Sequence, residues 1–130
     1  MTPYAEDNLK IDISLKRGVT WMDWLGRSDN RNPGLSLGPY LSRLVDELSR
    51  KDVVMRFTDL EYMNSSTVPP LIRFMKHLDD RQIRTRILFD KDSRWQRASF
   101  KALESLVIRM QHVQIIGCRK GDESAALNAR

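Results

Sequence analysis

The sequence predicts an α/β fold: a single domain in which helices alternate with the strands of a mixed sheet. Three features indicate this class. They are an alternating apolar pattern near the N-terminus, three segments with the apolar period of a helix, and short apolar runs between those segments. The chain has 130 residues, of which 41% are apolar and 30% charged. This composition is ordinary for one folded domain and argues against extensive disorder.

The first part of the chain is expected to form a β-hairpin. Apolar and polar residues alternate over Leu9–Leu15, as on a half-buried strand. The segment Lys16–Gly18 then predicts a tight turn into a second strand, Val19–Leu25. Gly26–Gly34 is dense in turn-forming residues and is therefore expected to be an exposed loop.

The middle of the chain alternates between helix and strand patterns. Leu37–Leu48 carries apolar residues at the spacing of an amphipathic helix, and Val53–Thr58 is a short apolar run typical of a strand buried on both faces. A second helix is expected to begin near Val68, followed by a strand over Ile83–Phe89. Strands and helices that alternate at this spacing favour parallel pairing with right-handed crossovers.

The last third of the chain predicts one more helix and one more strand. Asp92 or Ser93 can cap a third helix. Its expected apolar face consists of Trp95, Ala102, Leu103, Leu106 and Val107. Val113–Ile116 is the expected last strand, so the predicted domain covers residues 1–117 and residues 118–130 form a flexible tail. The predicted order is a hairpin followed by α-β-α-β-α-β, with the helices packed on the sheet.

Several functional classes are disfavoured by composition. Cys118 is the single cysteine, which excludes an internal disulfide and suits a reducing compartment. No signal segment or membrane span is evident, so we expect a cytoplasmic protein without a membrane partner. His77 and His112, together with Cys118, match no metal-ligand spacing, and no phosphate-binding glycine motif is present. We therefore expect no metal and no cofactor.

The net charge of +5 has one source in the sequence. Residues 81–109 hold an excess of Arg and Lys that equals the imbalance of the whole chain. The plain interpretation is a solvated basic face, and the sharper one is a docking surface for an acidic partner or a phosphate group. Arg84, Arg86, Arg94 and Arg97 with Trp95 also leave nucleic-acid binding open as an alternative function.

Four capping-type residues, Asn64, Ser65, Ser66 and Thr67, stand in succession before the second helix. This is more than one helix start needs. Because proline is tolerated only in the first helical turn, Pro69-Pro70 favours a cap at Ser66 or Thr67, with Ser65 on an elbow outside the helix. The alternative is a helix that begins at Ser65 with a distorted turn. In either case a phosphate on a serine here would be accommodated by the free N–H groups of the helix start.

The segment from Phe57 to Ser66, followed by an amphipathic helix, resembles the core motif of STAS-domain anti-sigma-factor antagonists. That motif is a strand, an aspartate, a short turn and then Asp-Ser-Ser-Gly at the start of a helix. The likeness is closer to a STAS-like branch with asparagine in place of the motif aspartate, which includes the biofilm-regulation phosphoproteins and related cyanobacterial regulators. It covers roughly residues 37–116. The chain departs from the commoner motif at Asn64, at Thr67 and in Pro69-Pro70.

The resemblance implies a single STAS-like domain that switches partners when it is phosphorylated on serine. The phosphoacceptor maps to Ser65, with Ser66 as the runner-up. The expected partner-binding residues are Asp59, Met63, Asn64, Ser66, Thr67, Arg94 and Arg97. The implied partners are a serine kinase of the histidine-kinase-like fold, a metal-dependent serine phosphatase, and an effector such as an anti-sigma factor or a diguanylate cyclase.

Because parallel strands end at the same edge of a sheet, Arg94 and Arg97 can lie beside the Asn64-Ser65 elbow and pair there with a phosphoserine or an acidic kinase loop. The alternative is that they are the solvated first turn of the third helix.

An enzyme is the interpretation that the residues favour least. A serine hydrolase would place its nucleophile in a Gly-x-Ser-x-Gly elbow, and neither Ser65 nor Ser66 has flanking glycines. His77 lies some three turns along the following helix, where it would point away. The remaining alternatives to the switch are a small basic nucleic-acid-binding module and a protein-interaction module that binds constitutively.

Overall fold

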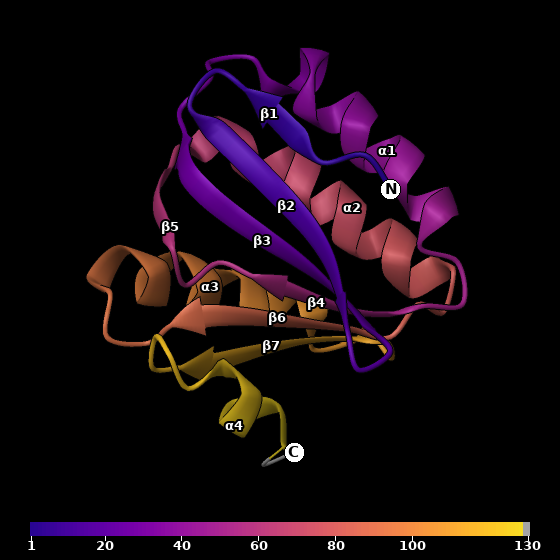
Figure 1. The fold of residues 1–130 in the computed structure, drawn as a ribbon. Helices are drawn as coiled ribbons and strands as arrows, with labels where there is room; N and C mark the ends of the chain where they lie inside the picture. The colour runs from indigo at the N-terminus through magenta and orange to yellow at the C-terminus, as the bar shows by residue number, and fades with distance from the viewer. Residues whose placement is uncertain (129–130) are drawn as a thin grey trace.

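The structure is a computed structural model that describes residues 1–128 (Figure 1). It has one seven-stranded sheet in the order β1-β2-β3-β4-β6-β7, and β5 pairs with β3 beyond the end of β4. The strands are β1 Tyr4–Glu6, β2 Leu9–Lys16, β3 Val19–Ser28, β4 Asp52–Arg56, β5 Leu60–Met63, β6 Thr85–Asp90 and β7 Val113–Cys118. The helices are α1 Leu37–Glu47, α2 Val68–Asp80, α3 Arg94–Val107 and α4 Glu123–Asn128.

The sheet is mixed, as the sequence predicts. The first three strands pair antiparallel, and all pairs among β3, β4, β5, β6 and β7 are parallel. The α/β class and the predicted order of hairpin and alternating helices are confirmed. Two strands were not predicted: β1, which extends the hairpin side, and β5, which lies inside the segment expected to be a short connection.

The helices cover the two faces of the sheet unequally. The main core joins α1, α2 and α3 to one face, with Trp24, Phe57 and Phe100 fully buried at its centre. The opposite face has a smaller cluster around Trp21 and Leu88, against which the α4 residue Leu127 packs (Figure 1). Trp21 and Trp24 thus lie on opposite faces, and both are buried.

The predicted apolar face of the third helix is wrong in part. Its buried positions are Gln96, Phe100, Leu103 and Val107, whereas Ala102 is exposed and Leu106 is 46% exposed. The predicted face also lacks Phe100, an apolar residue, and Gln96, a polar residue at a core position. Its amide nitrogen donates to the carbonyl oxygens of Phe57 and Leu60, at 2.7 and 3.0 Å. A pattern based on apolar residues alone cannot find such a position.

The chain beyond residue 117 is ordered differently from the expected tail. Strand β7 runs on to Cys118, and the short helix α4 follows. Glu123 at the start of α4 is buried and accepts hydrogen bonds from Thr58 and from the backbone N–H of Gly121. These contacts hold α4 on the sheet. Residues 129–130 lie outside the described part of the chain.

Among residues 1–128, no helix combines the length and the apolar composition needed to cross a membrane.

Candidate functional site

The candidate site is the elbow between β5 and α2, residues 64–67. Ser65–Thr67 forms a single 3-10 turn, and Asn64 before it is extended, with φ −80° and ψ 167°. The Asn64 side-chain oxygen accepts from the backbone N–H of Thr67 at 3.1 Å and from its hydroxyl at 2.7 Å. Asn64 is therefore the cap of this turn.

The α-helix itself begins at Val68, as predicted, and the prolines that follow lie in its first turn. The prolines displace no hydrogen bond there, since the first N–H groups of a helix have no partner within it. Of the two starts that the sequence leaves open, the structure has the first for the α-helix, with Thr67 at its cap position, and it adds a separate 3-10 turn, Ser65–Thr67, ahead of the helix. Ser65 is thereby fixed on the outside of the elbow.

The elbow is joined to the end of β3 and the loop that follows it. The backbone N–H of Asn64 donates to the Ser28 carbonyl at 2.9 Å, and its side-chain amide donates to the Asn30 carbonyl at 2.8 Å. The hydroxyls of Thr67 and Ser28 lie 2.7 Å apart, and both residues are buried. These bonds make the elbow and the Asp29–Arg31 loop one surface at the same end of the sheet.

The hydroxyl groups of the two serines are free, in contrast to the Thr67 hydroxyl. Ser65 is exposed and Ser66 is half-buried. Within the described residues 1–128, neither serine hydroxyl takes part in a hydrogen bond, while Thr67 is fully buried and bonded. The structure therefore presents Ser65 to solvent on a backbone that its neighbours hold in place.

Asp59, an expected partner-binding residue, is engaged inside the molecule. Its carboxylate contacts the Arg56 guanidinium at 2.7 Å and the Lys120 ammonium at 2.9 Å. Burial raises the pKa of Asp59, but the bonds to Lys120 and Arg56 outweigh it, so that the pKa is lowered overall. Met63, also expected at the interface, is 8% exposed and belongs to the main core.

The centre of this ion-pair cluster is Arg56, which the sequence analysis did not single out. Its guanidinium contacts Asp23 at 2.9 Å and Glu123 at 3.1 Å in addition to Asp59. Burial opposes the charge of Arg56, yet the hydrogen bonds to Asp23 and Asp59 raise its pKa. The sequence feature that could have identified the cluster is the arginine at the end of an otherwise apolar strand, because a partly buried charge needs partners of opposite charge.

Within residues 1–128, no hydrogen bond or ion pair joins Arg94 or Arg97 to the elbow. Both are exposed at the start of α3, and Arg97 donates to the Lys91 carbonyl of its own loop at 3.1 Å. The start of α3 instead meets the bend between β4 and β5, through Gln96. Strand β5, which was not predicted, lies between this bend and Ser65 along the chain.

The basic segment 81–109 is not one continuous free surface. Arg81 pairs with Asp46 of α1, and both Arg84 and Arg86 contact Asp52 of β4. The segment is also divided among the end of α2, strand β6 and helix α3. This distribution gives little support to a nucleic-acid groove along it.

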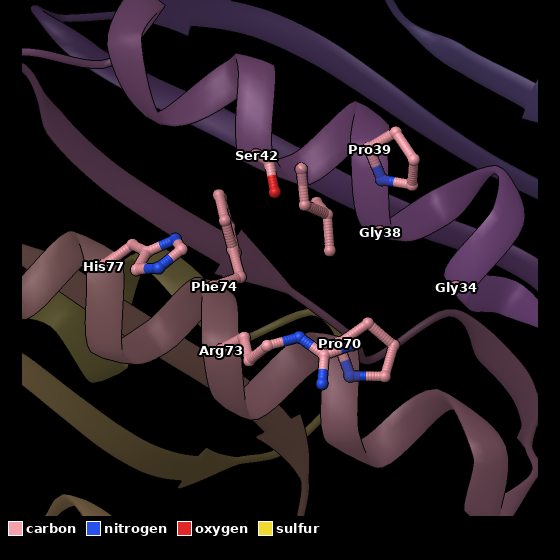
Figure 2. Close-up of a pocket in the computed structure, with 9 residues that line it drawn as sticks. Gly34, Gly38, Pro39, Ser42, Pro70, Arg73, Phe74 and His77 are labelled. Atoms are coloured by element: carbon pink, nitrogen blue, oxygen red, sulfur yellow. The ribbon is translucent and has the colours of Figure 1, made fainter.

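Helix α2 carries its histidine on another side of the molecule. His77 lines a groove of about 270 Å³ between α1 and α2, with Arg73 and Phe74 beside it (Figure 2). Among residues 1–128, no histidine is hydrogen-bonded to Ser65 or Ser66, and no group of three His, Cys, Asp or Glu side chains is placed to hold a metal ion. Cys118 is buried, and burial raises the pKa of its thiol to about 11.

Three solved structures resemble this chain in fold. An anti-sigma factor antagonist from Mycobacterium paratuberculosis aligns with a TM-score of 0.64 at 13% identity, over 95% of this chain and 97% of that chain. The anti-sigma factor antagonist SpoIIAA in its unphosphorylated form aligns with a TM-score of 0.57 at 14% identity, over 92% of this chain and 99% of that one. The Bacillus cell fate determinant SpoIIAA in its phosphorylated form gives 0.59 at 17% identity, with the same coverage. No family model and no curated protein matches the chain in sequence. The chain therefore has the fold of anti-sigma factor antagonists.

Proposed function

We propose that this protein is a partner-switching regulator that acts by binding, with Ser65 as its phosphoacceptor. The main observation behind the proposal is that the side chains of the elbow differ in whether they are hydrogen-bonded. Asn64 and Thr67 use their side chains to hold the turn against β3, whereas the Ser65 hydroxyl is exposed and free among the described residues. Ser66, the second candidate, is half-buried and less accessible to a kinase.

A phosphate on Ser65 would change the surface more than the fold. It adds a charge of about −1.5 to −2 and three acceptor oxygens. The start of the turn leading into α2 tolerates negative charge because of its free N–H groups. The bonds of Asn64 and Thr67 do not involve Ser65, so they persist in the modified protein. A partner that covers the elbow meets the added charge directly.

The surface around Ser65 has the apolar side chains that a protein interface needs. Leu35 in the loop after β3 is 78% exposed, and Tyr62 on β5 is 39% exposed. The Arg27 guanidinium lies over the Tyr62 ring, 4.7 Å from its centre. Aromatic residues and arginine are the residue types that contribute most at protein interfaces. We infer that the partner footprint is centred on Ser65, Leu35 and Tyr62.

The other expected contact residues have different roles in this proposal. Asn64, Thr67 and Met63 shape the elbow from within, and Ser66 lies on its rim. Asp59, Arg94 and Arg97 form the far side of the footprint, across β5, and only a large partner reaches them. The partners we propose are the serine kinase, the metal-dependent phosphatase and the anti-sigma-factor or diguanylate-cyclase effector that the motif implies, all in the cytoplasm.

We propose that the chain is related to the biofilm-regulation phosphoproteins and cyanobacterial regulators whose motif has asparagine in place of aspartate, and the bonding of Asn64 supports this. Its amide both accepts from Thr67 and donates to the Asn30 carbonyl. An ionised aspartate accepts hydrogen bonds and cannot donate them. The hydrogen bonds of this elbow therefore need an asparagine, and not an aspartate, at position 64.

The test is an affinity enrichment from the native host with four baits. These are the unchanged protein and its Ser65→Ala, Ser65→Asp and Ser66→Asp variants. We expect an effector retained by the unchanged protein and by Ser65→Ala, and lost with Ser65→Asp because of like-charge or desolvation costs at the elbow. Ser66→Asp is the matched control and is expected to retain the effector. Equal retention by all four baits would contradict a charge switch at Ser65.

A further inference from the structure

A second concave surface lies on the α4 face of the sheet, at the end opposite to the elbow. It is a hollow of about 580 Å³ between the β2–β3 hairpin, strand β6 and helix α4. Its lining residues are Lys16, Arg17, Val19, Trp21, Arg86, Ser124, Leu127 and Asn128. This volume falls in the range of small-molecule sites.

Arg86 in this hollow is a buried cation without full pairing. On strand β6, Arg86 is paired with Val54 of β4, which is in turn paired with Trp21 of β3. An apolar side chain would pack well at this position. Its side chain is 9% exposed. One terminal nitrogen meets an oxygen of Asp52 at 3.4 Å, and the Nε atom has no hydrogen-bond partner among the described residues. A buried guanidinium N–H without an acceptor costs free energy that a bound anion would recover.

The β-hairpin brings two more cations to the same hollow, Lys16 and Arg17. The Lys16 ammonium lies over the Trp21 ring, 5.2 Å from its centre. Arg17 and Gly18 form the hairpin turn, with positive φ values of 52° and 79°. This backbone conformation sets the direction of the Cα–Cβ bond of Arg17. The opposing carboxylate is Asp52, which also pairs with Arg84 at 3.3 Å. Positive charge therefore dominates this hollow.

The remaining walls are apolar or neutral. Val19, Trp21 and Leu127 provide an apolar side, while Ser124 and Asn128 of α4 add uncharged polar groups. Three cations beside an apolar wall match a ligand that has an anionic end and a flat apolar part. We propose that this hollow binds a small organic phosphate of about mononucleotide size, with Arg86 and Arg17 on the phosphate. This site is separate from the Ser65 elbow and does not depend on the function proposed for it.

The experiment is an NMR titration of the full chain with inorganic phosphate, phenyl phosphate and adenosine monophosphate. We expect saturable shifts of the Arg86 Nε–H and the Trp21 indole N–H, with phenyl phosphate and adenosine monophosphate binding at least about fivefold more tightly than inorganic phosphate because of the apolar wall. If none of the three ligands gives saturable shifts up to about 10 mM, the proposal is overturned.

The matched variants separate a site from a general charge effect. Arg17→Asn removes one cation and keeps a residue that tolerates positive φ, so the fold is retained. It should weaken adenosine monophosphate at least about tenfold. Arg50→Asn removes the same charge at another exposed arginine with positive φ, 62°, and should change nothing. Equal weakening by both variants would overturn the proposal, as would binding of anionic lipid vesicles or RNA without saturable binding of adenosine monophosphate.

Discussion

At the scale of single residues, the elbow depends on the side-chain amide of Asn64, which both accepts and donates hydrogen bonds. The Asn64 oxygen accepts from Thr67 while its nitrogen donates to the Asn30 carbonyl at 2.8 Å. The asparagine thus caps the turn and binds the neighbouring loop with the same side chain. A carboxylate at this position would keep the cap and lose the donor.

We predict that Asn64→Asp lowers the free energy of unfolding by about 1–3 kcal/mol, since a carboxylate oxygen would face the Asn30 carbonyl without a proton between them. Urea unfolding measures the change. The control is Asn32→Asp, the same chemical change at an exposed asparagine without a side-chain cap bond, which should be within about 0.5 kcal/mol of the unchanged protein. A loss at Asn32 as large as that at Asn64 would contradict this role for the amide.

At the scale of elements, strand β3 determines where the elbow lies. It pairs with β4 along its first half and with β5 along its second half, and the register shifts between Gly26 and Arg27. Gly26 has a φ of +83°, and its α-carbon lies so close to the Asn8 carbonyl that a β-carbon would overlap it. The glycine permits both the shift and the close approach.

We therefore predict that Gly26→Ala is severely destabilising, by about 3 kcal/mol or more, because it adds backbone strain and a backbone overlap together. The comparison is Gly18→Ala in the hairpin turn, where φ is +79° and no atom lies within 4 Å of the added carbon. That variant has the strain alone and should lose about 1–2 kcal/mol. Thermal unfolding of both variants measures the difference, and equal losses would contradict the overlap argument.

The elements that the sequence predicts are those with a repeating apolar pattern. The starts of α1 and α2 and the β2–β3 hairpin follow from periodicity and turn residues, as does the position of Ser65–Thr67 before α2. The sequence did not predict strand β5, because only its first and last residues, Leu60 and Met63, are buried and its pattern does not alternate. The sequence did not predict helix α4 either, because the helix is held in place by a buried carboxylate, that of Glu123. Tertiary hydrogen bonds and ion pairs leave no periodic trace in a sequence.

At the scale of the whole molecule, the Arg56 cluster ties the end of the chain to the sheet. Arg56 contacts Glu123 of α4, and Lys120 before α4 contacts Asp59. Burial alone would raise the pKa of Glu123, but the hydrogen bonds from Thr58 and Arg56 lower it overall, and the pKa of Asp59 is lowered as well. Carboxylates with lowered pKa values stabilise the fold above the pKa of the unfolded chain, and this contribution is lost as the pH falls through the folded pKa.

We predict that Glu123→Gln lowers the melting temperature at pH 7, and that the difference shrinks as the pH falls below the pKa of an ordinary glutamate and through the lowered pKa of the folded protein, where the carboxylate becomes protonated. Melting curves of the two proteins from pH 7 to pH 3 measure this. A difference in melting temperature that stays constant over the whole range would contradict the role of the charge.

The two ends of the sheet have different chemistry in this account. One end presents an exposed serine whose hydroxyl has no hydrogen bond among the described residues, and Leu35, in the loop after β3, and Tyr62, on β5, are exposed at this end. The other end holds the basic hollow around Arg86. The α4 helix and the Arg56 cluster lie on the same face as this hollow. Modification at the elbow is therefore expected to leave the hollow and its ligand binding unchanged.

The most direct test of the central claim is phosphopeptide mass spectrometry of the protein purified from its native host under several growth conditions. The peptide that spans Ser65 and Ser66 must be fragmented between the two residues. We predict a phosphate on Ser65 in a condition-dependent fraction of the protein. Phosphate on Ser66 alone, or an unmodified peptide in every condition, would contradict the proposed switch and leave a constitutive binding module in its place.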